Sequence, residues 1–274
     1  MSKNIKIETY VSDKLTMDYI KFGHGSNTLV ILPGLSVQSV MLLADAVADA
    51  YDCMTNDFTI YLFDRRKNLP SVYTQEDMAL DAAEAIIGLG LKGVYLFGTS
   101  QGGMMSLVIA AQYPELVNKM VIGSGTSKIE DKNVAVFSNW IDLAREGNAE
   151  ELYVSFCELL YSEEMFKQSR DLFIELSKTV TKEELERFVV LAGAAKDFDV
   201  TDRLSEIKCP VLVIGNKDDK VLGGEASEII ADNLINSADC ELYMYDGYGH
   251  ASYDTAPDYK ERITAFLLKE NNGR

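Results

Sequence analysis

Short, uninterrupted apolar runs alternate with helical stretches along most of the chain. Runs such as 28–32, 93–97 and 210–214 are typical of strands that are buried on both faces. Parallel strands need a long crossover between them, and a helix is the usual one. The sequence therefore predicts an α/β fold, with a mostly parallel central sheet flanked by helices.

The alternation places individual elements along the chain. An opening hairpin is expected over 5–11 and 16–22, because two β-rich segments there are separated by turn residues. Further strands are expected at 28–32, 58–63, 93–97, 116–122, 210–214 and 240–245. Helices are expected at 36–51, 75–87, 101–113 and 225–235, with a last one ending near Lys269.

The alternation of strands and helices stops between about Ser127 and Val200. Apolar strand runs are absent there, and amphipathic helical stretches such as 150–160 and 183–191 replace them. We interpret this segment as a helical insertion. The expected organisation is a core formed by 1–126 and 201–274, with 127–200 as an inserted cap.

The charge and composition of the chain indicate which kinds of molecule it is expected to bind. The 274 residues carry 26 Lys and Arg against 43 Asp and Glu, a net charge of −17 that disfavours nucleic acid and anionic membranes. We find neither a stretch long enough to span a membrane nor the apolar core of a signal peptide, so a cytoplasmic protein acting on a small molecule is expected. The four scattered cysteines are expected to be buried free thiols.

A Gly-Thr-Ser-Gln-Gly segment at 98–102 lies between an expected strand and an expected helix. In that setting a G-x-S-x-G motif places its serine on a sharp turn, with the hydroxyl above the sheet edge and helix N–H groups beside it. Ser100 is therefore a candidate nucleophile for acyl transfer. The same letters elsewhere would indicate only a glycine-rich turn.

A serine nucleophile requires a base and a carboxylate that orients it. Of the two histidines, His24 precedes the first buried strand and is interpreted as a turn residue. His250 follows the last strand, at the edge where parallel sheets gather functional groups. The loop after 210–214 offers Asp218 or Asp219 as the carboxylate.

The order Ser100, aspartate, His250 resembles that of the α/β-hydrolase superfamily, and the similarity covers nearly the whole chain outside the cap-like insertion. The resemblance implies Asp218 as the acid, in the third position after the strand's last glycine, with Asp219 as the alternative. Asp246 and Asp254, on either side of His250, are interpreted as loop charges.

The same resemblance implies an oxyanion hole made of the backbone N–H groups of Leu35 and Gln101. This chain has Pro33-Gly34 where many relatives have His-Gly, which leaves a backbone donor available. Arg66 matches the arginine of an Asp-x-Arg segment and is expected to form a structural ion pair.

These residues predict a serine hydrolase that needs no cofactor or metal and resembles a carboxylesterase, acting on a small to medium, largely apolar ester. The same triad can serve carbon–carbon bond hydrolysis, thioester hydrolysis or perhydrolysis, which all remain open. A non-catalytic ligand receptor on this fold is the rival from a different class. Loss of a triad residue would favour the receptor, and none is lost here.

Overall fold

The computed structural model describes residues 4–270 and contains one sheet of eight strands. Their order across the sheet is β1-β2-β4-β3-β5-β6-β7-β8. The first two pairings are antiparallel and the others are parallel, as the alternation predicts. The strands are β1 (Ile7–Val11), β2 (Thr16–Gly23), β3 (Asn27–Leu32), β4 (Phe58–Arg66), β5 (Val94–Thr99), β6 (Val117–Gly123), β7 (Val211–Asn216) and β8 (Cys240–Tyr245).

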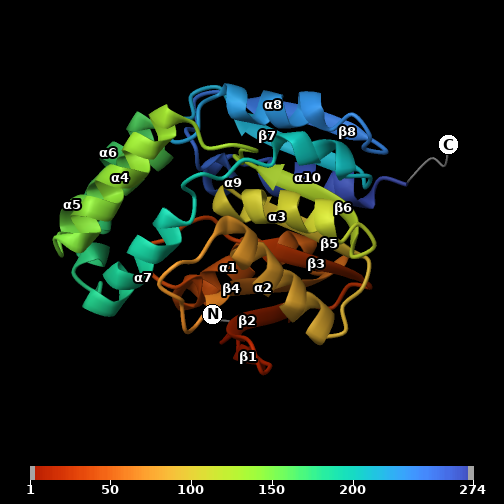
Figure 1. Cartoon of the computed structure of the whole chain (residues 1–274), viewed down its shortest axis with the longest axis horizontal. Coiled ribbons are helices and arrows are strands. Elements are labelled where there is room, and N and C mark those ends of the chain that lie inside the picture. The colour runs from red at the N-terminus through yellow and green to blue at the C-terminus, as the bar shows by residue number, and fades with distance from the viewer. Residues whose placement is uncertain (1–3, 271–274) are drawn as a thin grey trace.

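Helices cover both faces of the sheet (Figure 1). Alternate residues of each strand point to opposite faces, so in β3 Leu29 and Ile31 join one core while Val30 and Leu32 join the other. The first core packs under α1 (Ala44–Ala50) and α10 (Tyr259–Leu268), and the second packs under α2 (Gln75–Gly88), α3 (Gln101–Gln112) and α8 (Glu225–Asn233). Burial on both faces explains why the inner strands β3, β5 and β7 contain uninterrupted apolar runs.

The helix expected over 36–51 is shorter than predicted. Residues 33–39 form a loop, followed by the 3-10 helix η1 (Val40–Leu43) and then α1. Ser39 begins η1 because its hydroxyl accepts the Met41 N–H, at 3.2 Å, while donating to Asp64 at 2.5 Å. The chain from Pro33 to Ser39 is thereby held as a loop over the carboxyl ends of β3 and β4.

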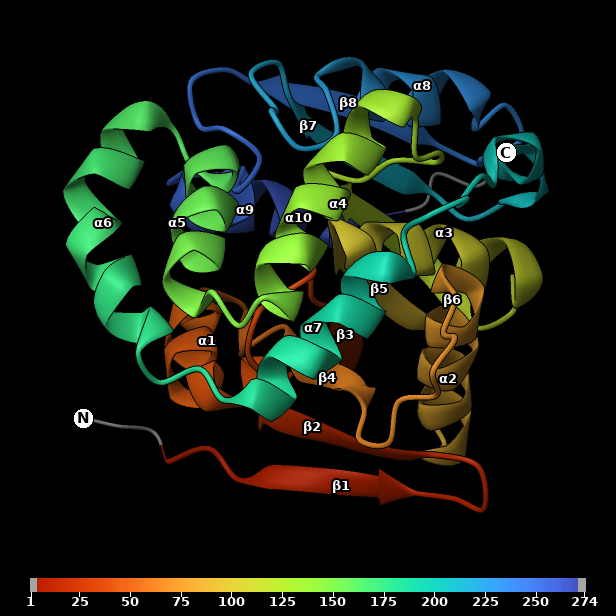
Figure 2. The ribbon, with the colours of Figure 1, turned by 60° about the vertical axis from the view of Figure 1, so that its left-hand side comes forward.

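Four helices form the predicted insertion between β6 and β7. They are α4 (Asp131–Arg145), α5 (Ala149–Leu160), α6 (Glu163–Ser177) and α7 (Lys182–Gly193), and Figure 2 shows them grouped over one end of the sheet. The chain enters and leaves side by side: the Val200 N–H donates to Ser127 O at 2.8 Å, and the Ile129 N–H to Phe198 O at 2.9 Å. The division into a core and a cap as separate domains stays a prediction.

Two composition-based expectations have different outcomes. Within residues 4–270, we find no helix with the length and apolarity needed to cross a bilayer. The expected burial of all four cysteines is wrong, because Cys53 and Cys240 are exposed while Cys157 is buried.

Candidate active site

Ser100 stands at the junction of β5 and α3, at the carboxyl edge of the sheet. Its backbone has φ 50° and ψ −118°, a left-handed conformation that a non-glycine residue adopts only under strain. The Ser100 N–H donates to Gly123 O at 2.8 Å, which fixes the turn against β6. The predicted strand–turn–helix setting of the motif is confirmed.

The turn depends on the glycine two residues after the serine. A Cβ on Gly102 would lie 1.9 Å from Leu32 O, a distance no side chain can occupy. The first turn of α3 therefore presses directly on the end of β3. This contact brings the loop after β3, which carries Leu35, next to Ser100.

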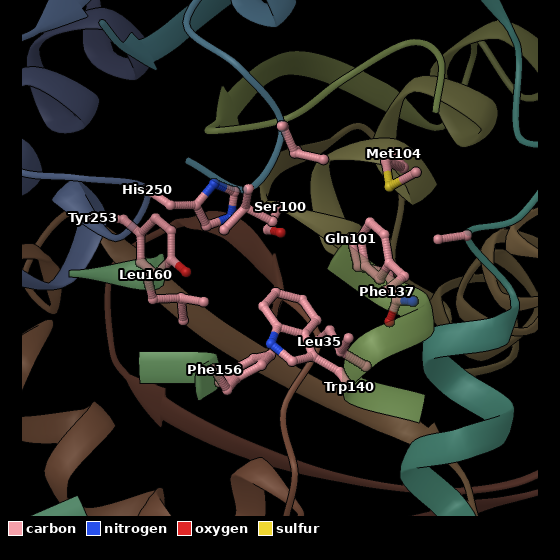
Figure 3. A pocket seen from close by; sticks show the side chains of 13 residues that line it. Leu35, Ser100, Gln101, Met104, Phe137, Trp140, Phe156, Leu160, His250 and Tyr253 are labelled. Carbon is pink, nitrogen blue, oxygen red and sulfur yellow. The ribbon is translucent and has the colours of Figure 1, made fainter. Parts of the chain in front are cut away.

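His250 is presented by the loop between β8 and the short helix α9 (Ser252–Thr255). Its Nδ1 lies 2.7 Å from Asp219 Oδ2, and both side chains are almost fully buried. Figure 3 shows the imidazole beside Ser100. No hydrogen bond between Ser100 Oγ and His250 is found in the described part of the chain, and such contacts often tighten only when substrate binds.

The predicted contact between Asp218 and His250 is wrong, since Asp219 makes it. Strand β7 continues to Asn216, and the following turn, closed by the Asp219 N–H and Asn216 O at 3.3 Å, directs Asp219 inward. Asp218 points the other way and accepts the N–H groups of Gly247, at 3.2 Å, and Gly249, at 2.8 Å. Asp218 thus orders the backbone of the loop that carries the histidine.

Asp219 is held as an anion in spite of its burial. Burial raises the pKa of this carboxyl, but the charge and hydrogen bond of His250 and the two backbone donors outweigh it, so the net pKa lies below its usual value. The donors are the N–H groups of Val221 and Leu222, at 2.8 and 2.9 Å from Oδ1. Only Oδ2 is left to face the imidazole.

Leu35 and Gln101, whose backbone N–H groups are the predicted oxyanion hole, both line the cavity beside Ser100, and their role as donors stays a prediction. The buried Arg65 links the start of the loop that carries Leu35 to Gln101, because its Nη2 donates to Pro33 O at 2.7 Å and to Gln101 Oε1 at 3.2 Å. Gln101 Nε2 in turn donates to Leu191 O of α7, at 2.7 Å. The cap is therefore bonded to the residue that follows the serine.

Two cavities meet at the site. The chamber beside Ser100 has about 10 Å³ of free volume, room for about one water molecule. A second cavity of about 520 Å³, here called the cleft, extends between α1, α5 and α6. The chamber and the cleft share a wall of four side chains, which are Leu35, Phe156, Leu160 and Tyr253.

Some of the other residues considered from the sequence have structural roles, and some residues that the sequence did not point to lie at the site. His24 is exposed before β3, at the opposite edge of the sheet, as expected of a turn residue. Arg66 forms the expected ion pair, 3.3 Å from Asp81. Sequence reasoning missed Trp140 and Tyr253 in the chamber lining and Arg65 behind it. The available signal for Arg65 was its place near the carboxyl end of a buried strand, at the edge of the sheet where Ser100 lies.

Comparison with known proteins identifies the family. Residues 27–257 match the family described as alpha/beta hydrolase fold. Because the match covers most of the chain, the protein belongs to the α/β-hydrolase fold family.

Individual relatives share the fold but carry different activities in their names. The chain is 27% identical over 253 residues to "Putative carbamate hydrolase RutD" of Agrobacterium fabrum, covering 88% of this chain and 93% of that protein. It is 28% identical over 202 residues to 2-hydroxy-6-oxononadienedioate/2-hydroxy-6-oxononatrienedioate hydrolase of Burkholderia vietnamiensis, covering 66% and 64%. The crystal structure of MGS-M2, an α/β hydrolase enzyme from a Medee basin deep-sea metagenome library, superposes with a TM-score of 0.85 at 21% identity, covering 97% of this chain and 99% of that one.

Proposed function

We propose that the protein is a serine hydrolase that cleaves a small to medium, largely apolar ester through an acyl-enzyme. The observation that carries the proposal is the contact of His250 Nδ1 with Asp219, made beside a serine in a strained turn. With Nδ1 occupied, the imidazole has only Nε2 to accept a proton. A base of fixed tautomer next to a half-buried serine hydroxyl that lines a cavity is the arrangement that acyl transfer requires.

In the proposed mechanism, Ser100 Oγ attacks the ester carbonyl carbon while His250 Nε2 takes the hydroxyl proton. The N–H groups of Leu35 and Gln101 stabilise the negative charge that forms on the carbonyl oxygen. Collapse of the tetrahedral intermediate expels the alcohol, which receives the proton from His250. Water then repeats the sequence on the acyl-enzyme, and the carboxylic acid and free Ser100 are released.

The linings of the chamber and the cleft support a neutral reacting group. No lysine or arginine among the described residues lines either cavity, so neither offers a counter-charge to an anionic acyl group. This disfavours a dioate such as the one named for the Burkholderia relative. The adjoining cleft, at about 520 Å³, provides room for the larger portion of a substrate whose carbonyl lies at Ser100.

A chain-length series of p-nitrophenyl esters tests the proposal. Wild type is expected to hydrolyse the short-chain members, and Ser100→Ala is expected to lose this activity while remaining folded by circular dichroism. Ser106→Ala is a suitable control, because Ser106 is a buried serine of α3 whose hydroxyl donates to Gly102 O at 2.8 Å. Equal esterase activity in wild type and Ser100→Ala would contradict the proposal.

A neutral carbamate ester is the second candidate substrate, favoured by the name of the Agrobacterium relative. Its carbonyl can be attacked by the same serine, and its amide-like nitrogen adds no charge that the chamber must neutralise. Comparing kcat/KM for a phenyl carbamate and the matching phenyl ester separates the two. A higher value for the carbamate would replace the ester as the favoured substrate.

A further inference from the structure

The cleft beside the chamber has an unusual lining for an apolar cavity. Aromatic rings surround it, contributed by Tyr51, Tyr153, Phe156, Tyr161, Phe173 and Tyr253. Exposed leucines stand on its rim, with Leu42 66% and Leu176 40% exposed. Among the described residues that line it, Asp254 is the one charged side chain. An apolar cavity with a single carboxylate suits a ligand with one positive charge.

The Asp254 carboxylate has capacity for a ligand. Within the described residues this carboxylate accepts one hydrogen bond, from the Tyr161 hydroxyl at 3.5 Å, which is the outer limit for such a contact, whereas a carboxylate can accept about four. The residue is exposed, yet it lies in the cavity lining. In the described residues no ion pair joins Lys260 to Asp254, and the Lys260 ammonium lies 5.5 Å from the Tyr51 ring centroid and donates to Tyr253 O.

The position of Asp254 connects it to the proposed catalytic residues. Its neighbour Tyr253 belongs to the shared wall, with its ring centroid 6.3 Å from that of His250. A molecule whose scissile bond lies at Ser100 can therefore extend past Tyr253 toward the carboxylate. The net charge of −17 also attracts cations to the protein as a whole.

We propose that the cleft binds the cationic end of an amphiphilic amine, with Asp254 as its counter-ion and the aromatic rings around its apolar body. The inference deepens the proposed function, on which it rests, by naming the substrate class: an ester that carries a protonated amine some distance from the scissile bond. Cation–π contact with the surrounding rings adds to the ion pair. A neutral substrate of the same size loses both interactions.

Binding of two matched ligands that cannot be hydrolysed tests this inference separately from catalysis. The probes are 4-phenylbutylamine and 4-phenylbutan-1-ol, which share one apolar body and differ in charge, titrated into wild type by calorimetry at neutral pH. The amine is expected to bind about tenfold more tightly than the alcohol, in line with a charge-assisted hydrogen bond. Asp254→Asn is expected to remove this difference, whereas the control Asp246→Asn, which removes an exposed carboxylate near Lys217, should keep it.

Leu176→Lys provides a second route that does not disturb Asp254. The exposed position accepts a lysine, whose charge at the rim should weaken binding of the amine and leave the alcohol unchanged. Equal affinity for the two probes in wild type, or an amine preference that survives in Asp254→Asn, would overturn the inference. Ester turnover by wild type without amine preference removes the inference alone. Amine binding that depends on Asp254 without any esterase activity removes the proposed function and the assignment of an ester as substrate, and leaves the cleft as an amine-binding site.

Discussion

Replacing Asp219 by asparagine should impair catalysis by enforcing the wrong tautomer of His250. In wild type, Asp219 Oδ1 accepts the N–H groups of Val221 and Leu222, and Oδ2 faces His250 Nδ1. In the variant, the two backbone donors hold the amide oxygen, so the amide NH2 group turns toward Nδ1. The imidazole must then accept a hydrogen bond at Nδ1 and carry its proton on Nε2, where it cannot receive the proton of Ser100.

The expected loss in kcat is about 10⁴-fold, the size found when the orienting aspartate of a serine triad is changed to asparagine. This corresponds to about 5 kcal/mol of transition-state stabilisation. The fold should persist, because both backbone hydrogen bonds to Oδ1 remain possible. Kinetics with a short-chain p-nitrophenyl ester, together with thermal unfolding followed by circular dichroism, measure the two effects separately.

Asp218→Asn is the matched control, one residue away. Its amide oxygen can still accept one of the two glycine N–H groups that Asp218 holds, so we expect a loss in kcat below about tenfold, the size of one hydrogen bond. The reasoning is refuted by the opposite pattern, a severe loss in Asp218→Asn with nearly normal turnover in Asp219→Asn.

Three further predictions concern the wall, the turn and the acid range. Leu160→Ala removes part of the shared wall, so it should shift the preferred p-nitrophenyl ester toward longer chains and lower the free energy of unfolding by about 2–5 kcal/mol. Leu172→Ala, at an exposed position, should change neither the chain-length preference nor the free energy of unfolding. Gly102→Ala should lower the free energy of unfolding in urea by about 3 kcal/mol, because its Cβ would meet Leu32 O at 1.9 Å, and an unchanged value would rule out that close approach. Because the pKa of Asp219 is lowered in the folded protein, its ionised form stabilises the fold above about pH 4, and this contribution disappears as pH falls through the lowered value. The difference in unfolding free energy between wild type and Asp219→Asn should therefore shrink on acidification. A difference that does not depend on pH contradicts this prediction.

The sheet and the serine turn could be predicted because both leave a local signature. Strands buried on two faces require uninterrupted apolar residues, and the turn at Ser100 requires glycines at fixed offsets. His250 was found from its position after the last strand. The strands, the Ser100 turn and the position of His250 can each be predicted from residues that are close together in the sequence.

The carboxylate that contacts His250 was misplaced by one residue because two adjacent aspartates differ only in the turn that carries them. Counting from Gly215 points to Asp218, but the backbone between Asn216 and Asp219 turns so that the second carboxylate enters the site. The N–H groups of Val221 and Leu222, which hold Asp219, carry no residue-specific signal. The spacing of residues in the sequence therefore does not determine which of two adjacent loop aspartates contacts the histidine.

Contacts between distant segments were also beyond the sequence. Arg65 meets Pro33 and Gln101 only because β3, β4 and β5 end side by side. From the sequence, Asp254 is interpreted as an ordinary loop charge. In the structure it lines the cleft, because α5 and α6 of the insertion form the other side of that cavity. Both residues gain their surroundings from tertiary packing rather than from their neighbours in the chain.

Labelling with a fluorophosphonate, followed by intact mass spectrometry, tests most directly the claim that Ser100 is an activated nucleophile. Wild type should gain a single adduct mapped to Ser100, Ser100→Ala should gain none, and Asp219→Asn should react far more slowly than Asp218→Asn. A folded wild-type protein that resists the probe, or an adduct on another residue, would contradict the account and favour a ligand receptor on the hydrolase fold.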